Sequence, residues 1–273
     1  MANPNQLKEA EAVSYSGVPS YVKSARNEIW VANLIPFIAV VLWYFFSLRV
    51  PEFVLPNPLV VAVMTARLFF EPSLLIHTLV SLGRVLASVI LALFLGCALV
   101  LMARYFSITR AFVGARFIPF VNAFPSLGWA MLAVIWFGVS NSSVIFVETA
   151  ILLPFCMINM WEGFKSLDEE LLEMGVSFTR KKRKVLVKII LPLLFPYIFS
   201  ALRVSYGVGW KVSLIAELFG ARTGLGYLLN LARQNFDTPL MFGAIVVIII
   251  LVGLFDNVVF KFLEKRVMKY TPA

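Results

Sequence analysis

Residues 240–260 read LMFGAIVVIIILVGLFDNVVF, and Asp256 is the one charged residue among them. A helix needs about 20 mostly apolar residues to cross the hydrocarbon layer of a membrane. Lipid offers the backbone no hydrogen-bond partners, so a single spanning segment has to pair its own peptide groups as a helix. This stretch therefore predicts a membrane-spanning helix near the carboxyl end of the chain.

Five further apolar runs are long enough to cross a membrane. Two of them contain charged residues, with Glu148 in the fourth predicted span and Arg203 and Lys211 in the fifth. Another stretch, residues 57–70, is too short and too mixed to span, and we expect a short interfacial helix there. The sequence thus predicts an all-α membrane protein with about six transmembrane helices, at 30–48, 85–102, 117–137, 144–161, 193–215 and 240–260.

The composition of the chain excludes an ordinary soluble domain. Of its 273 residues, 60% are hydrophobic and 14% are charged, whereas soluble domains carry roughly a quarter charged residues. Most basic residues behind the net charge of +9 lie between the apolar runs, which favours membrane orientation over nucleic-acid binding. Cys97 and Cys156 lie inside apolar runs and His77 is the single histidine, so we expect neither a disulfide framework nor a metal cluster.

The distribution of basic residues predicts the orientation in the membrane. Cytoplasmic segments of membrane proteins are enriched in lysine and arginine. With the amino terminus inside, the predicted cytoplasmic segments hold seventeen of these residues and the predicted outer segments hold five. Both termini are therefore predicted to be cytoplasmic, with residues 1–28 as a polar tail and residues 29–273 as the transmembrane domain. No small-residue cleavage site follows the first apolar run, so we expect no cleaved signal peptide.

The largest predicted cytoplasmic segment, residues 164–192, carries the most specific motif. Its residues 173–175 (Glu-Met-Gly) are followed after three positions by Thr179, and after nine more by residues 189–192 (Ile-Ile-Leu-Pro). This spacing resembles the coupling loop of type I ABC importer permeases, where Glu-Ala-Ala precedes a glycine and then Ile-x-Leu-Pro. Thr179 replaces that glycine, and because threonine rarely adopts positive φ angles, Gly175 would have to supply the flexibility. The closing Leu-Pro is expected to mark where the loop turns into the fifth span.

The resemblance covers residues 50–266 and favours the nitrate, sulfonate and taurine branch of the family. Each matching piece is short, but their order and spacing together are specific. The pieces are Leu55-Pro56-Asn57-Pro58, Ser81-Leu82-Gly83-Arg84, Trp136-Phe137-Gly138, Leu202-Arg203, Trp210, Ala216-Glu217, Gly224-Leu225-Gly226-Tyr227 and Phe236-Asp237-Thr238.

The resemblance also implies a set of partners. Two copies of the chain would form the pathway in the bacterial inner membrane, two cytoplasmic ATPase subunits would drive it, and an extracytoplasmic binding protein would deliver the solute. The chain itself lacks a Gly-x-x-x-x-Gly-Lys-Ser/Thr phosphate loop, so we expect it to have no ATP site, no cofactor and no enzymatic activity. The residues expected to couple to the ATPase are Leu172, Glu173, Met174, Gly175, Phe178, Thr179, Ile189, Leu191 and Pro192.

Charged residues inside the spans are candidates for the transport pathway, because they are expensive to place in lipid and usually face a cavity or a partner. Arg203 and Lys211 favour a cationic lining for an anionic solute. The alternative is that Arg203 pairs with an acid or with carbonyls and that Lys211 reaches the interface. Glu148 lies near enough to the start of its span to reach the outer interface. The candidate pathway residues are Arg203, Trp210, Lys211 and Glu217.

Two other classes of protein remain as alternatives to an importer permease. A membrane-embedded enzyme would need His, Asp or Glu residues that converge at one depth, and the spans offer only Glu148, Asp256 and edge positions. An ion-coupled secondary transporter would be expected to have more helices and inverted repeats, and no internal repeat is evident. Small anions are the favoured solutes, but the sequence alone does not name one.

Overall fold

The computed structural model describes residues 25–105, 112–167, 173–174, 177–179 and 181–267. Within these ranges all regular structure is helical and there is no strand, which confirms the predicted all-α class. The chain divides into two units, residues 1–58 and residues 59–273. Each unit is described by itself.

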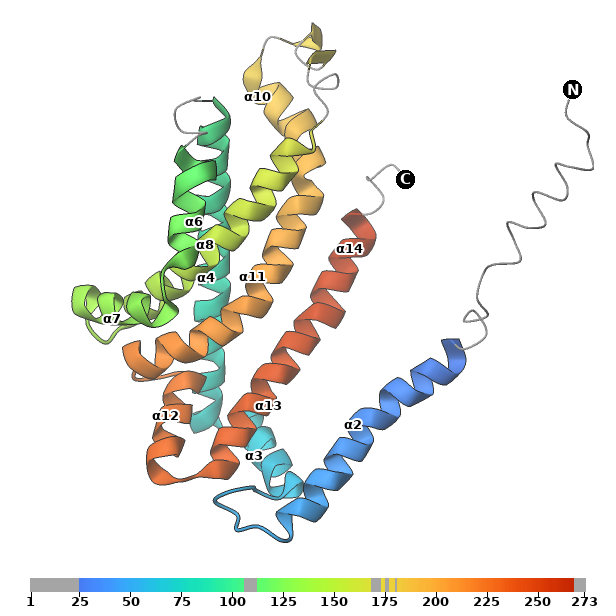
Figure 1. The fold of residues 1–273 in the computed structure, drawn as a ribbon, viewed down its shortest axis with the longest axis vertical. Coiled ribbons are helices and arrows are strands. Elements are labelled where there is room, and N and C mark those ends of the chain that lie inside the picture. Colours follow the sequence, from blue (N-terminus) through green and yellow to red (C-terminus); the bar gives the residue numbers. More distant parts are fainter. Residues whose placement is uncertain (1–24, 106–111, 168–172, 175–176, 180, 268–273) are drawn as a thin grey trace, which may run out of the picture. The chain divides into compact units, whose positions relative to one another are not determined.

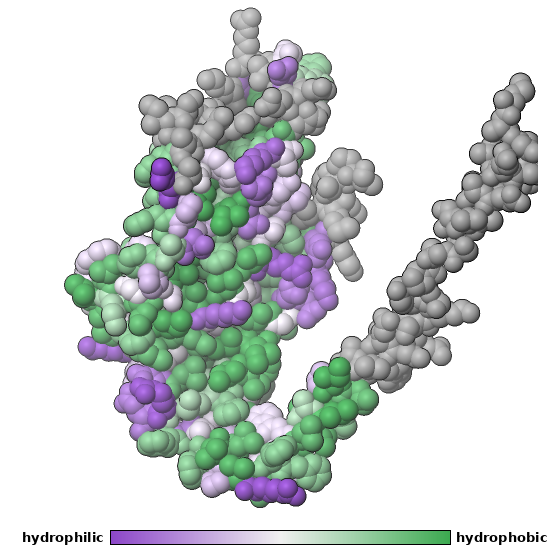
Figure 2. All heavy atoms as spheres, in the orientation of Figure 1, coloured by the Kyte–Doolittle hydropathy of each residue, from purple (hydrophilic) through white to green (hydrophobic). Residues whose placement is uncertain are grey.

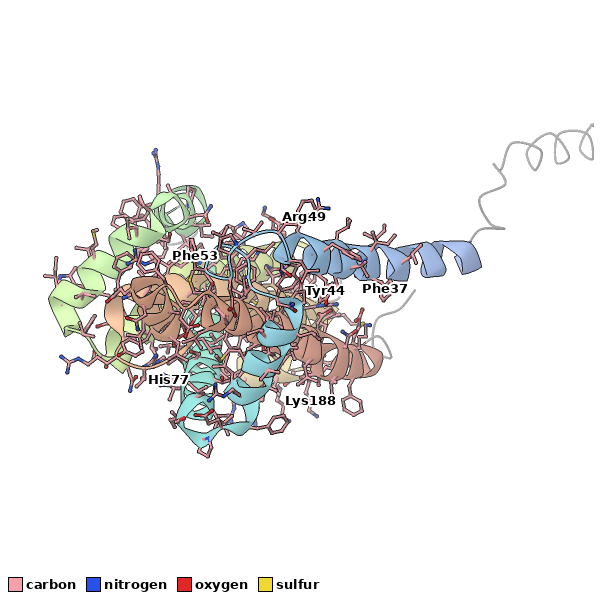
Figure 3. All side chains as sticks on the ribbon, turned by 90° about the horizontal axis from the view of Figure 1, so that it is seen from below. Phe37, Tyr44, Arg49, Phe53, His77 and Lys188 are labelled. Carbon is pink, nitrogen blue, oxygen red and sulfur yellow. The ribbon has the colours of Figure 1, made fainter. Side chains whose placement is uncertain are left out.

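The amino-terminal unit contains helix α2 (Ala25–Ser47). Trp43 Nε1 donates a hydrogen bond to Pro56 O at 3.0 Å, which ties the helix to the segment that follows it. Large apolar side chains are open on its surface, among them Phe37 and Phe53 (Figure 3). Such exposure suits contact with lipid better than contact with water. Helix α2 covers residues 30–47 of the predicted first span, 30–48.

The second unit is built around a helical bundle. Four of its described helical stretches are long and apolar enough to cross a membrane, and α4, α8 and α11 pack side by side (Figure 1). Apolar residues cover much of the visible face of the molecule (Figure 2). The main helices are α4 (Pro72–Tyr105), α8 (Asn141–Lys165), α11 (Leu191–Gly220) and α13 (Thr238–Leu254).

Shorter helices connect and flank this bundle. Helix α3 confirms the short helix that the sequence predicts at residues 57–70. Helix α12 is followed by Phe236, whose φ of 56° is left-handed. Asp237 then caps α13 by accepting a hydrogen bond from Leu240 N at 3.0 Å. The bounds are α3 (Pro58–Phe70), α6 (Ile118–Ala123), α7 (Ser126–Phe137), α10 (Lys182–Val185), α12 (Leu225–Asn235) and α14 (Lys261–Val267).

The predicted third span, residues 117–137, is not one helix. Helix α6 ends at Ala123 and helix α7 begins at Ser126. Between them Phe124 is extended, with ψ of 128°, because the ring of Pro125 disfavours helical geometry in the residue before it. The apolar run conceals this break, since neither Phe124 nor Pro125 is polar.

In the part of the chain that the structure describes, three π-helical segments interrupt the regular helices: η2 (Val113–Phe117), η3 (Leu186–Ile190) and η4 (Phe255–Phe260). In the first two, the hydrogen bond that closes the segment reaches back five residues, from Ile118 N to Val113 O and from Leu191 N to Leu186 O. A proline follows directly in both cases. Proline lacks an N–H and its ring crowds the preceding turn, and the wider π turn relieves that crowding.

The π segment before Pro192 corrects one sequence-based expectation. Residues 183–220 form one continuous helical stretch, so the chain does not turn at Leu191-Pro192. The helix of the fifth span instead extends back into the predicted coupling loop. Helix α4 is longer than predicted as well, because it begins at Pro72 and not near residue 85.

Candidate functional site

A buried polar network joins α4, α11 and α12 at the end of the bundle opposite α10 (Figure 1). Its centre is Glu217 on α11, which is 1% exposed. The Glu217 carboxylate accepts hydrogen bonds from Ser81 Oγ at 2.8 Å, from Arg84 Nη1 at 2.7 Å and from Gly226 N at 2.8 Å. A carboxylate is tolerated in the interior when it is paired and hydrogen-bonded in this way.

Arg84 is the cation of this network, and it uses all five of its N–H donors. Nε and Nη2 donate to Asn141 Oδ1 on α8. Nη1 donates to Glu217 and to Thr223 O at 2.7 Å, and Nη2 donates to Thr223 Oγ1 at 2.9 Å. The planar fork of arginine suits such a cluster of acceptors, whereas lysine has only three donors on one atom. We call these residues, with Ser81 and the turn described next, the Arg84–Glu217 network.

The turn between α11 and α12 depends on a glycine. Gly224 has φ of 114°, and a Cβ at this position would collide with the Glu217 carboxylate. Its N–H donates to Nδ1 of His77 (labelled in Figure 3) at 3.0 Å, and the next N–H, of Leu225, donates to Ser81 Oγ at 2.7 Å. The His77 ring also stacks on Tyr227. Helix α4 thus holds the turn through side chains placed one and two turns apart.

The sequence analysis identified the segments that contribute to this network, but it did not predict that their side chains meet. The stretches 81–84, 216–217 and 224–227 were matched to a family separately, and Glu217 was predicted to line the pathway. A usable signal was present, because His77, Ser81 and Arg84 follow the i, i+4, i+7 spacing of one helix face. Three polar residues on one face of an apolar helix indicate a polar partner inside the protein.

Two of the four candidate pathway residues lie in the interior of the chain. Trp210 is 1% exposed and packs in the main hydrophobic core with Val85, Val89 and Leu152. Glu217 is held in the Arg84–Glu217 network. Neither side chain reaches the surface of the chain in this conformation, and their contact with a solute stays a prediction.

Arg203 pairs with acidic side chains, which was the alternative to a role in binding the solute. Its Nε and Nη2 donate to the two carboxylate oxygens of Asp256 at 2.7 and 3.0 Å, and Nη1 lies 3.4 Å from Glu264 Oε2. Asp256 belongs to η4 and Glu264 to α14, so the arginine bridges α11 to both parts of the last helical stretch. Two carboxylates balance its charge, which leaves little of it to attract an anion.

Lys211 is the other cation of α11, and it is exposed. It forms no ion pair with any described residue. Exposed apolar side chains lie one turn and two turns further along, at Ile215 and Phe219. The helix ends at Gly220, nine residues and about 14 Å away along its axis, which is farther than a lysine side chain reaches. Lys211 therefore presents a charge on an apolar helix face.

The interpretation of Glu148 as an interfacial residue is wrong. Its side chain is fully buried, and neither carboxyl oxygen has a hydrogen-bond partner among the described residues. The error has a simple cause, because the position of a residue along a helix does not tell which face it occupies. Glu148 faces the packed interior between α4, α8 and α11.

The predicted coupling loop is described in part, since Leu172 and Gly175 lie outside the described residues. Residues 173–174 and 177–178 are helical, and Ser177 Oγ donates to Glu173 O one turn back at 2.9 Å. Met174 and Phe178 are 52% and 83% exposed. The loop therefore carries apolar side chains on its surface.

The glycine that the loop motif lacks is not needed at Thr179. Among the described residues, Phe236 is the only one other than glycine with a positive φ. Thr179 Oγ1 instead accepts a hydrogen bond from Lys181 N at 3.3 Å. Of the remaining motif residues, Ile189 is partly exposed at the end of η3, and Leu191 and Pro192 are exposed at the start of α11.

A family comparison decides what these features belong to. The family described as binding-protein-dependent transport system inner membrane component matches residues 88–269, which is most of the chain. The chain belongs to this family. Membership confirms the predicted fold and the role of a permease component in a transport system, and it supports a multi-pass protein of the inner membrane. It favours neither a membrane-embedded enzyme nor a secondary transporter.

Individual members of the family differ in the solute that their names record. The taurine transport system permease protein TauC of Escherichia coli is 30% identical over 69% of this chain and 68% of its own length. The SsuC protein of Bacillus subtilis, provisionally assigned to aliphatic sulfonate transport, is 26% identical over 88% of both chains. The riboflavin transport system permease protein RibX of Chloroflexus aurantiacus is 32% identical over 45% of this chain and 46% of its own.

Proposed function

We propose that two copies of this chain form the pathway of an ATP-driven importer for a small organic or inorganic anion of the sulfonate, taurine or nitrate type. The names of the similar permeases from Escherichia coli and Bacillus subtilis support this solute class. An extracytoplasmic binding protein delivers the anion, and two separate ATPase subunits supply the energy. The chain contributes the helical bundle, and ATP binds to its partners.

The exposed side chain of Lys211 is the main structural support for an anionic solute. Two unit charges about 4 Å apart attract by about 1 kcal/mol in water and by about 4 kcal/mol near a protein surface. An exposed ammonium on an apolar helix face, with no ion-pair partner among the described residues, is therefore a suitable contact for an anion that leaves water. Arg203 is the contrasting case on the same helix, because Asp256 and Glu264 already balance its charge.

Replacement of Lys211 by glutamine tests the solute class. The complex of this chain with its ATPase and binding protein is reconstituted in vesicles, and ATP-driven uptake of a labelled alkanesulfonate and of taurine is measured. We expect uptake to fall about tenfold or more, since tenfold corresponds to about 1.4 kcal/mol. Arg233→Gln is the control, because that exposed cation lies on α12 next to Asn230 and should leave uptake unchanged.

Uptake that is equal in Lys211→Gln and in the wild type would remove the support for an anion. The same vesicles would then be tested with riboflavin, the solute in the name of the Chloroflexus aurantiacus permease. Riboflavin uptake that Lys211→Gln leaves intact would assign the chain to an uncharged solute. The proposed role as an importer permease would stand in that case, and the anion would not.

We also propose that both termini and the loop around residue 182 are cytoplasmic. Single cysteines introduced after replacement of Cys97 and Cys156 test this with an impermeant thiol reagent in intact cells. Ser142→Cys is preferred to a change at the adjacent Asn141, because Asn141 binds Arg84. We expect Ser142→Cys to be labelled and Lys184→Cys to be protected until the membrane is opened. The reverse pattern would invert the topology.

The loop of residues 164–192 is the proposed contact with the ATPase. Its described part offers exposed apolar side chains beside a charged rim, a composition typical of protein contact surfaces. Because residues 183–220 form one continuous helical stretch through η3 into α11, a push on the loop acts directly on the helix that carries Lys211. Movement of the ATPase would in this way reach the pathway through one rigid element.

A further inference from the structure

Glu148 is a buried acid that the transport role does not use. It projects from α8 into the packed interior and is 0% exposed. Neither Oε1 nor Oε2 has a hydrogen-bond partner among the described residues. Buried polar groups in folded proteins are nearly always hydrogen-bonded, so an unpartnered carboxyl group calls for a specific explanation.

Two hydroxyl groups from the neighbouring helices face this carboxyl group. Ser88 on α4 and Ser213 on α11 both lie beside the Glu148 side chain, and they are 0% and 2% exposed. Ser88 Oγ donates a long hydrogen bond of 3.4 Å to Ile145 O, whereas Ser213 Oγ has no partner in the described part of the chain. Three helices therefore direct a carboxyl group and two hydroxyl groups at one buried point.

Among the described residues, no cation has a donor left to pair with an ionised Glu148. The charged side chains nearest to Glu148 among the described residues are Arg84 on α4 and Glu217 on α11. All five N–H donors of Arg84 are already used by Glu217, Asn141 and Thr223. Glu217 has the same sign as an ionised Glu148 and would repel it. An ionised Glu148 would thus be a buried anion with no cation hydrogen-bonded to it in the described part of the chain.

We propose that Glu148, Ser88 and Ser213 form a proton-binding site in the middle of the bundle, with Glu148 as a neutral carboxylic acid. An isolated charge is far more expensive to bury than a neutral group that can find a hydrogen bond. A protonated carboxyl group has one O–H donor and an acceptor oxygen, and a serine hydroxyl can serve as either partner. Hydrogen bonds between the protonated Glu148 and these two hydroxyl groups would satisfy the buried polar atoms without a ligand other than the proton.

The site lies at the junction of α4, α8 and α11, so its proton depends on how these helices pack. While the interior is closed, no water reaches the carboxyl group and the proton stays bound. A movement of α11 relative to α8 that admits water would let the group ionise. The site is independent of the proposed solute, because none of its three side chains is exposed to a pathway.

Infrared difference spectroscopy tests the protonation of Glu148 directly. Spectra of the purified full chain in lipid discs are recorded at neutral pH for the wild type and for Glu148→Gln. We expect the variant to lose one C=O band of a protonated carboxylic acid. Glu71→Gln is the matched control, because hydrogen bonds from Ser73 and Arg67 hold the pKa of Glu71 below its usual range. That variant should lose a carboxylate band.

Loss of a carboxylate band in Glu148→Gln would overturn the proposal, since it would mean an ionised Glu148. If that carboxylate band then changed between buffers containing sodium and choline, a bound metal ion would be identified as the counter-charge. Ser213→Ala provides a second measurement that keeps Glu148 in place if the glutamine variant does not fold. It should shift the frequency of the acid band, and an unshifted band would exclude Ser213 as the hydrogen-bond partner.

Discussion

Replacement of Arg84 by glutamine is expected to destabilise the folded chain by about 3–5 kcal/mol, the effect of leaving one member of a buried ion pair without its partner. Glu217 would stay in the interior as an anion with its Ser81 and Gly226 bonds only. Asn141 and both Thr223 oxygens would lose donors at the same time. The turn that leads from α11 into α12 should therefore loosen first. Thermal unfolding of the purified chain in detergent measures the change.

Two variants make this expectation specific to the Arg84–Glu217 network. Arg67→Gln removes an arginine from an ion pair with Glu71 whose side chains are 56% and 38% exposed, and such pairs contribute about 0–1 kcal/mol. The double variant Arg84→Gln with Glu217→Gln removes both buried charges, and it should be destabilised by less than the sum of the two single changes. Equal stability of Arg84→Gln and Arg67→Gln would contradict the role assigned to the network.

The helical class and the positions of the main helices could be predicted because they depend on apolar length, which is a local property. The run at 240–260 became α13 and η4, and the run at 144–161 lies within α8. Breaks and extensions were harder to predict. Phe124-Pro125 breaks an apolar run without changing its hydropathy, and α4 continues through Arg84 because partners distant in sequence satisfy that charge.

The side-chain roles could be predicted only in part, because they depend on contacts between distant segments. Arg203 could face a solute or an acid, and the choice rests on Asp256, more than fifty positions away. Glu148 and Lys211 are both charged residues within spans, yet one is fully buried and the other exposed. The sequence pattern records that each residue is charged and does not record what lies opposite it.

The coupling loop was predicted on spacing alone, and its described part has the exposed apolar side chains that a docking surface needs. Phe178→Asp is therefore expected to reduce binding of the ATPase subunits about a hundredfold. The Phe178 ring is 83% exposed in the free chain, and burial of such a ring at an interface contributes about 2–3 kcal/mol. A charged replacement would also have to be desolvated on docking, which adds to the loss.

The measurement is co-purification of the ATPase with the chain from membranes, followed by ATP-driven uptake in vesicles. Phe236→Asp is the matched control, since that ring is 76% exposed and lies beyond α12, at the other end of the bundle from α10 (Figure 1). It should retain the ATPase. Glu173→Lys, which reverses a charge in the same loop as Phe178, should weaken binding as well.

The helical stretch from Arg183 to Gly220 connects the two ends of the bundle. Variants at the two ends should nevertheless differ in their effects on stability and on ATPase binding. Phe178→Asp should leave the melting temperature of the isolated chain unchanged, since its ring contributes nothing to the folded chain before docking. Arg84→Gln should lower that temperature. Normal ATPase binding and normal uptake in both Phe178→Asp and Glu173→Lys would show that the loop around these two residues is not the docking surface.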